Sequence, residues 1–292
     1  MLLMDEYEVF LQKSKNLSHN TMLSYIRDIH KYASYLENAE LDCVMASKDD
    51  IVDYLALMQK NGQAASSVLR MIASLRSYYG FILENGAVSA DPTIGLKAPK
   101  LPKREFEILT PRETEMFLSQ PECTNFKGYR DKAMLELIYA TGIKVSELIA
   151  LSIDDLNIKE SYILCGSGTK KRIIPFGVIA KNALKQYLEN ARFKKQFDEE
   201  NNYLFINVKG GTLSRQGFWK IIKFYKDKAK IDKEINSNTL RHSFAVHLME
   251  NGADIASVQE MLGHTAVTST KIYAETVNRR LHDVYKKTHP RA

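Results

Sequence analysis

Residues 238–248 read NTLRHSFAVHL and are more informative than any other stretch of this chain; LGH follows at 262–264 and TKIY at 270–273. Arg241 precedes His264 by 23 residues, and Tyr273 follows that histidine by nine. Each residue alone has an ordinary explanation. A tyrosine in a helical stretch usually packs against a core, a lone arginine usually lies at the surface, and a histidine after glycine is usually a turn residue. Their ordered spacing favours one shared function.

The sequence upstream of this stretch predicts a mostly helical domain with one hairpin. TPRE at 110–113 places threonine at a helix cap, proline at the first helical position and glutamate at the third, which is a strong helix start. Helices are expected around 129–140 and 145–151. Two short strands, 162–165 and 172–176, flank the turn GSGT at 166–169 and predict an antiparallel hairpin.

The N-terminal part, residues 1–87, predicts four helices of its own. The first lies at about 5–14, and the second runs from near Ser18, a favoured N-cap residue, to about 37. The third opens with SKDD at 47–50, which resembles a capping box, and the fourth runs from about residue 63 to a stop at Asn85-Gly86. Residues 88–108 hold three prolines and several basic residues, so they read as an interdomain linker. This linker is either a plain spacer or a segment that lies against phosphates. A second domain follows over residues 109–292.

Charge is distributed unevenly between these parts. Net charge is +6 for the 292 residues. Residues 1–100 hold 10 Lys/Arg and 12 Asp/Glu, whereas residues 101–292 hold 31 and 23, a balance of +8. We therefore expect any electrostatic attraction for nucleic-acid phosphates to lie mainly in the second part.

Composition excludes several other classes of protein. No run approaches the ~18 apolar residues of a membrane helix, and the N-terminus does not resemble a signal peptide, so we expect a cytoplasmic protein without a membrane partner. The three cysteines, Cys43, Cys123 and Cys165, are far apart and form no CxxC pair. They support neither a disulfide framework nor a zinc site.

Together these motifs resemble the tyrosine site-specific recombinases of the phage integrase family, whose pattern is HxxRH…LGH…Y. ATGIKVSEL at 140–148 is similar to the segment that carries the first arginine of the family, and THPRA at 288–292 resembles the tail of the XerC and XerD recombinases. The resemblance covers nearly the whole chain. It implies a mainly α fold, with a four-helix core-binding (SAM-like) domain and an α-rich catalytic domain that carries a small antiparallel β-hairpin.

The resemblance also implies residue roles. Tyr273 would attack a DNA phosphate and form a covalent 3′-phosphotyrosine, Arg241 would clamp that phosphate, and His264 would hydrogen-bond a nonbridging oxygen or assist proton transfer. No metal or cofactor is expected. The predicted DNA contacts are Arg70, Arg76, Lys100, Lys103, Arg104, Lys171 and Arg172. The partners implied are double-stranded DNA and a homo- or hetero-oligomer with a related recombinase, as a tetramer on two sites.

Three positions depart from the family pattern. Lys144 stands at the first arginine, Ser167 at the hairpin lysine and Asn238 at the first histidine. Lysine keeps the charge but lacks the planar guanidinium that binds two phosphate oxygens. Asn238 cannot exchange a proton near pH 7, and Lys170 or Lys171 is a candidate substitute for the missing hairpin lysine.

Three functions remain open at this stage. The first is an active but atypical recombinase, acting in chromosome partition or in DNA integration of a mobile element. The second is a catalytically impaired, recombinase-like protein with a DNA-binding or regulatory role. A relaxing activity of the type IB topoisomerase kind is third. Arg241, His264 and Tyr273 favour the enzyme, whereas Lys144, Ser167 and Asn238 favour the second.

Overall fold

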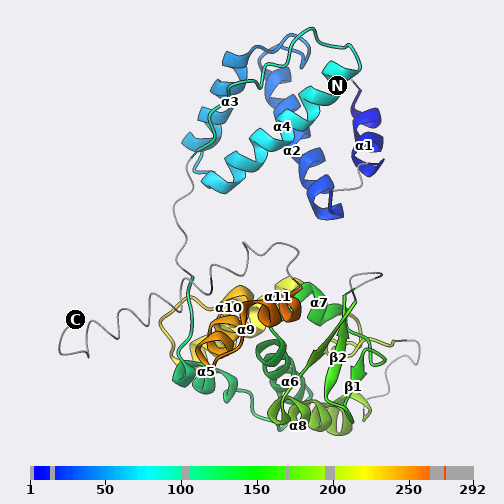
Figure 1. Cartoon of the computed structure of the whole chain (residues 1–292), viewed down its shortest axis with the longest axis vertical. Helices are drawn as coiled ribbons and strands as arrows, with labels where there is room; N and C mark the ends of the chain where they lie inside the picture. The colour runs from blue at the N-terminus through cyan, green and yellow to red at the C-terminus, as the bar shows by residue number, and fades with distance from the viewer. Residues whose placement is uncertain are drawn as a thin grey trace, which may run out of the picture. The chain divides into compact units, whose positions relative to one another are not determined.

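The computed structural model describes residues 3–13, 17–99, 106–166, 168, 171–194, 201–263 and 273. The chain divides into two compact units, residues 1–104 and 105–292. Each unit buries its own set of hydrophobic side chains, and Figure 1 shows the elements of each.

The described residues of the N-terminal unit form four helices, as predicted: α1 (Met4–Lys13), α2 (His19–Asn38), α3 (Lys48–Lys60) and α4 (Ala65–Glu84). The predicted caps are present. Ser18 accepts a hydrogen bond from the Thr21 backbone at the start of α2, and Ser47 forms a capping box with Asp50 at the start of α3. Helix α4 packs against α2 and α3, and its buried side chains form much of the core.

The C-terminal unit is mostly helical and carries a small sheet. Its helices are α5 (Pro111–Leu118), α6 (Phe126–Thr141), α7 (Val145–Ala150), α8 (Val178–Tyr187), a π-helical turn (Leu188–Arg192), α9 (Arg215–Ala229), α10 (Ser237–Glu250) and α11 (Ile255–Leu262). Its strands are β1 (Leu156–Asn157), β2 (Tyr162–Cys165) and β3 (Arg172–Pro175). The strands pair antiparallel in the order β1-β2-β3, so the predicted hairpin is confirmed and has one further short strand.

Helix α6 is the central helix of this unit and packs against both α8 and α10. It is buried on nearly every side, which is typical of a helix surrounded by others. The helix ends at Gly142, whose φ is +61°. A Cβ atom there would lie 2.3 Å from Cδ1 of Phe244 on α10. Glycine therefore allows the end of α6 to approach α10 closely, which positions the site described below.

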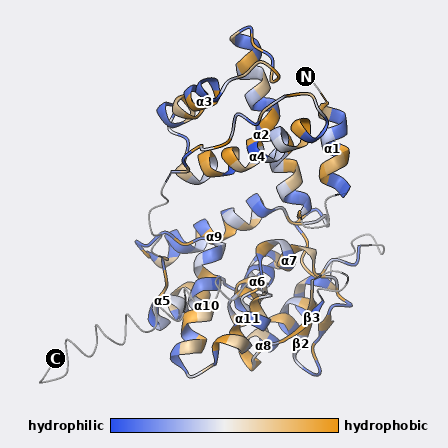
Figure 2. Ribbon diagram, turned by 45° about the horizontal axis from the view of Figure 1, so that its top comes forward, coloured by the Kyte–Doolittle hydropathy of each residue, from blue (hydrophilic) through white to orange (hydrophobic). Residues whose placement is uncertain are grey.

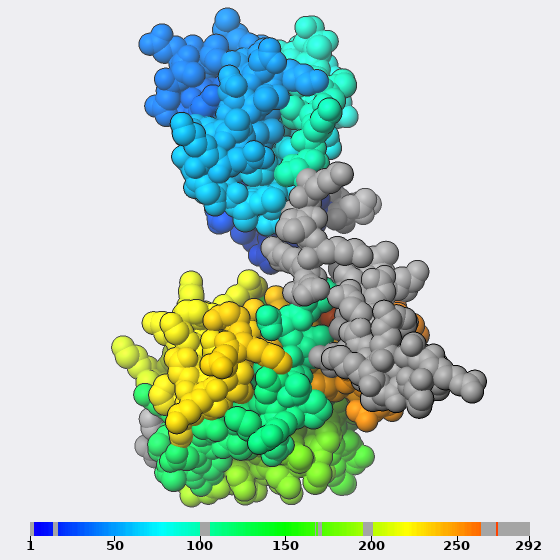
Figure 3. Space-filling view, turned by 90° about the vertical axis from the view of Figure 1, so that its left-hand side faces the viewer, coloured from blue at the N-terminus to red at the C-terminus, as the bar shows by residue number. Residues whose placement is uncertain are grey.

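The outer helices have mixed faces, visible in Figure 2 as hydrophilic and hydrophobic residues along the same helix. Helix α9 packs beside α5 and lies at the surface in the space-filling view (Figure 3). Trp219 and Phe224 on α9 are exposed. No helix in the described part of the chain is long and apolar enough to cross a membrane.

Candidate active site

Arg241 lies where the C-terminal end of α6, α10 and the end of α11 meet. Its side chain projects from α10 and is only 5% exposed. One terminal nitrogen donates to the Gly142 carbonyl at 2.5 Å, and the other donates to the Leu262 carbonyl at 2.6 Å. A guanidinium has five N–H donors, so these two bonds fix its plane and leave other donors for a ligand. The capping turns of α6 and α11 thus orient this arginine.

Tyr273 is buried in the same region, with 4% of its surface exposed. Its ring centroid lies 5.6 Å from that of His242 and 6.2 Å from that of Phe106. Burial raises the pKa of the Tyr273 phenol, and the positive charge of Arg241 opposes that rise. The charge of Arg241 favours the phenolate form of Tyr273. A hydroxyl that a nearby cation helps to ionise is suited to nucleophilic attack on a phosphate.

Lys144 and Asn238 are both exposed, and both lie close in sequence to the groups just described. Lys144 caps α7, two residues after the carbonyl that holds Arg241, and its backbone N–H donates to Oε2 of Glu147 at 2.9 Å. Asn238 lies in the first turn of α10, three residues before Arg241, and its backbone N–H donates to Oδ1 of Asn236 at 2.8 Å. Residues three apart on a helix are neighbours on its surface.

Arg172 on β3 forms an ion pair with Glu147 on α7. Two of its nitrogens donate to the two carboxylate oxygens at 3.0 Å each, and Nε donates to the Met261 carbonyl at 3.0 Å. A Cβ at Gly263 would lie 2.8 Å from the guanidinium carbon. Although burial raises the pKa of Glu147, the bonds from Arg172 and Lys144 hold that pKa below its usual value. The arginine therefore connects the sheet to α7 and to the end of α11.

The other residues predicted from sequence fall into three groups. Lys171 is exposed, as a phosphate contact requires. Arg70 donates twice to buried Asp28, at 2.7 and 3.0 Å, and Arg76 donates to the Leu96 carbonyl at 3.0 Å. The predicted residues that lie outside the described part of the chain are His264, Ser167, Lys170, Lys100, Lys103 and Arg104.

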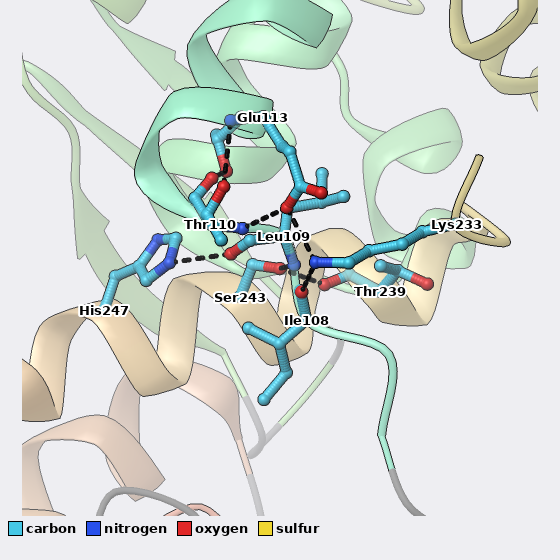
Figure 4. Close-up of polar contacts among 9 residues, drawn as sticks. Ile108, Leu109, Thr110, Glu113, Lys233, Thr239, Ser243 and His247 are labelled. Carbon is cyan, nitrogen blue, oxygen red and sulfur yellow. Dashed lines mark hydrogen bonds and ion pairs between the residues drawn. The ribbon is translucent and has the colours of Figure 1, made fainter. Parts of the chain in front are cut away.

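The sequence did not reveal a network of polar contacts between residues 108–110 and α10 (Figure 4). The backbone N–H of Leu109 donates to Oγ of Ser243 at 3.0 Å, and its carbonyl lies 2.9 Å from Nε2 of His247. Because a carbonyl only accepts, Nε2 carries the hydrogen, and Nδ1 bonds the Tyr139 hydroxyl at 2.9 Å. The quoted motif contained Ser243 and His247, but nothing in it indicated their partners.

The described residues were also considered as ligands for a metal ion. Within them, no three His, Cys, Asp or Glu side chains gather as they would around a metal ion.

Comparisons with known proteins match the whole length of the chain. The model of the phage integrase family matches residues 107–280, and that of the phage integrase N-terminal SAM-like domain matches residues 4–86. The chain is 44% identical to the tyrosine recombinase XerD of Listeria innocua serovar 6a over 99% of both chains. It is similar to the crystal structure of XerA recombinase, at 25% identity and a TM-score of 0.56, over 99% of this chain and 100% of that one. The Tn1549 transposon integrase in complex with circular intermediate DNA shares the fold, at 19% identity and a TM-score of 0.74, over 94% and 95% of the two chains.

Proposed function

The chain belongs to the phage integrase family of tyrosine recombinases and acts in site-specific DNA recombination, and we propose that Tyr273 is its nucleophile and Arg241 its phosphate clamp. The observation that carries this assignment is the burial of both side chains in one place. A phenol next to a fixed guanidinium is the arrangement that attack on a phosphodiester needs. The proposal goes beyond family membership because it assigns each role to a residue.

The reaction follows from these two groups. The Tyr273 oxygen attacks the phosphorus, the bond to the 5′ oxygen breaks, and a 3′-phosphotyrosine forms while the phenol proton leaves. The 5′ oxygen takes up a proton and departs as a hydroxyl. The same steps in reverse, with the 5′ hydroxyl of another strand, rejoin DNA without ATP because the covalent bond stores the energy. Arg241 stabilises the charge that develops on the nonbridging oxygens in both directions.

The remaining roles are also proposals. His264 bonds a nonbridging oxygen, and Lys144 contributes a point charge to the phosphate. Asn238 supplies a hydrogen bond, because an amide donates but does not transfer a proton near pH 7. Lys170 or Lys171 protonates the leaving oxygen. Support for Lys144 and Asn238 comes from their exposure and from their places beside the backbone and the helix that hold Arg241.

Duplex DNA and other recombinase subunits are the partners of this chain. We propose that four subunits assemble on two DNA sites and that a related recombinase supplies two of them. This proposal follows the resemblance to the XerC and XerD recombinases noted in the sequence, and the chain is 44% identical to a XerD. A gel-shift experiment with and without a candidate partner, followed by crosslinking, tests it: mixed tetramers are expected, and tetramers of this chain alone would contradict the hetero-oligomer.

Covalent attachment to DNA tests the assignment of the nucleophile. A duplex nicked near the cleavage position traps the adduct, because the short released strand diffuses away. We expect an adduct with the wild-type chain, none with Tyr273→Phe, and unchanged DNA affinity, since only a hydroxyl is removed. Tyr203→Phe is the matched control, because Tyr203 is an exposed tyrosine of the same unit. DNA binding without any wild-type adduct would favour the catalytically impaired alternative.

A further inference from the structure

Near the start of the second unit, residues 108–110, named here the strap, are fixed to α10. Both polar groups of the Leu109 backbone are bonded, to Ser243 and to His247, as Figure 4 shows. Lys233 adds a bond from Nζ to the Ile108 carbonyl at 3.1 Å and an ion pair of 2.7 Å with Glu113. The strap therefore cannot shift along α10 without breaking several hydrogen bonds.

The side chains of the strap and of the residues just before it reach the proposed nucleophile. Ile108 is 6% exposed and belongs to the hydrophobic cluster that contains Tyr273. Phe106, two residues earlier, packs against the same cluster, as expected for an extended chain in which alternate residues share a face. The Phe106 ring centroid lies 4.5 Å from that of His242 and 6.2 Å from that of Tyr273.

Each of these three rings lies against the other two, because the ring centroids of His242 and Tyr273 are 5.6 Å apart. Aromatic rings with centroids 4.5–7 Å apart favour edge and offset arrangements; Phe106 meets His242 edge-on, and the ring of Tyr273 is tilted against both. His242 is fixed by its place on α10 next to Arg241. Phe106 is fixed by the strap. Two independently anchored rings therefore flank the ring of Tyr273.

We propose that Phe106 is a positioning residue for Tyr273: the strap holds its ring against the ring of Tyr273 and so sets the direction of the hydroxyl. This inference rests on Tyr273 as the nucleophile. An attacking atom must approach the phosphorus within a narrow range of positions, and a misplacement of 1 Å costs up to ~10²-fold in rate. Removal of the Phe106 ring opens a void on one side of Tyr273, into which the ring can rotate.

Single-turnover cleavage of a nicked duplex at saturating protein tests this role. With Phe106→Ala we expect the rate of adduct formation to fall about tenfold, within the range for a misplaced nucleophile, with DNA affinity unchanged. Phe106→Tyr keeps the ring at a position that is half-buried rather than fully enclosed, and it should restore the rate. A residue that only stabilises the fold would not separate rate from affinity in this way.

Phe126→Ala is the matched control. Phe126 is a half-buried phenylalanine of the same unit, and its ring lies 6.2 Å from that of Tyr187, the same separation as Phe106 from Tyr273. We expect a similar loss of thermal stability and an unchanged cleavage rate. If Phe106→Ala does not fold, Phe106→Leu keeps apolar bulk without a ring and should give a smaller fall in rate.

The outcomes separate the two proposals. A Tyr273→Phe chain that still forms the adduct refutes the nucleophile assignment itself. An inactive Tyr273→Phe chain, together with a Phe106→Ala chain that cleaves at or above the wild-type rate, refutes only the positioning role of Phe106. Equal falls in the rates of Phe106→Ala and Phe126→Ala would also overturn it, because the effect would then be one of general stability.

Discussion

The two halves of the site differ in how their side chains are held. Arg241 and Tyr273 are 5% and 4% exposed, and backbone carbonyls and flanking rings fix them. Lys144 and Asn238 are exposed, and the backbone N–H group of each donates to a neighbouring side chain. By the pattern expected from the resemblance, the buried pair matches the family and the exposed pair departs from it. A buried side chain has partners that any substitute would leave unsatisfied, whereas an exposed one can change with little cost to the fold.

The largest change in cleavage rate is expected from a substitution in the buried half of the site. Arg241→Lys removes the planar guanidinium, so one ammonium must replace the bonds to Gly142 and Leu262 and the phosphate contacts together. We expect adduct formation to fall about 10²–10³-fold, the usual cost of an electrostatic donor to the transition state. Single-turnover cleavage measures it. Arg112→Lys, an exposed arginine on α5, is the control. Equal cleavage rates for Arg241→Lys and the control would contradict the role of the buried Arg241 in cleavage.

A gain of function is expected from the other half. Lys144→Arg, Ser167→Lys and Asn238→His together restore the family residues at all three departures. We expect adduct formation on a nicked duplex to rise at least ~10²-fold, the low end for one general acid. The same triple change in a Tyr273→Phe background should remain inactive. If the wild type already cleaves fast and the restored chain is no faster, the departures are harmless variants, and Lys170→Ala with Lys171→Ala should then abolish activity.

The local signals in the sequence predicted the helices well. Ser47 with Asp50 and Thr110 with Glu113 form the predicted capping boxes, because such pairs depend on residues only three apart. The resemblance to the family predicted that Arg241 and Tyr273 share one site; in the structure both are buried, and the positive charge of Arg241 lies near enough to lower the pKa of the Tyr273 phenol. Strand β1 was missed because its two residues, Leu156 and Asn157, are too few to show a pattern.

Contacts between distant residues could not be predicted from the chain. Arg172 was assigned to DNA, a role that stays a prediction, yet its three nitrogens bond Glu147 and Met261. Phe106 looked like part of a linker, although its ring meets those of His242 and Tyr273. No periodicity links residues so far apart, because only tertiary packing brings them together.

A smaller effect, on stability, is expected at Glu147. Because the folded-state pKa of this carboxyl lies below its ordinary value of 4.5, its charge stabilises the fold above that pH, and this contribution is lost as pH falls through the folded pKa. Glu147→Gln should destabilise by about 1–3 kcal/mol near pH 7, because the partly buried Arg172 loses its charged hydrogen-bond partner. Denaturant unfolding at several pH values measures it. A wild-type minus variant difference that does not shrink below pH 4.5 would contradict the pairing.

The smallest effect compares two adjacent cations. Lys171 is exposed, whereas the nitrogens of Arg172 are bonded within the unit. Lys171→Gln should weaken binding to all DNA sequences equally and reduce the slope of log K against log salt by about one. Arg172→Gln should instead lower thermal stability. Titrations at several salt concentrations, with melting curves for both variants, separate these results; an unchanged slope for Lys171→Gln would remove it from the DNA contacts.

The most direct test of the account is the identity of the residue that joins DNA. The adduct trapped on a nicked duplex is digested with nuclease and protease, and mass spectrometry locates the attached nucleotide. The account predicts one modified residue, Tyr273, with a 3′-phosphate linkage, and no modified peptide from Tyr273→Phe. A nucleotide on any other residue, or an adduct that persists in Tyr273→Phe, would contradict it.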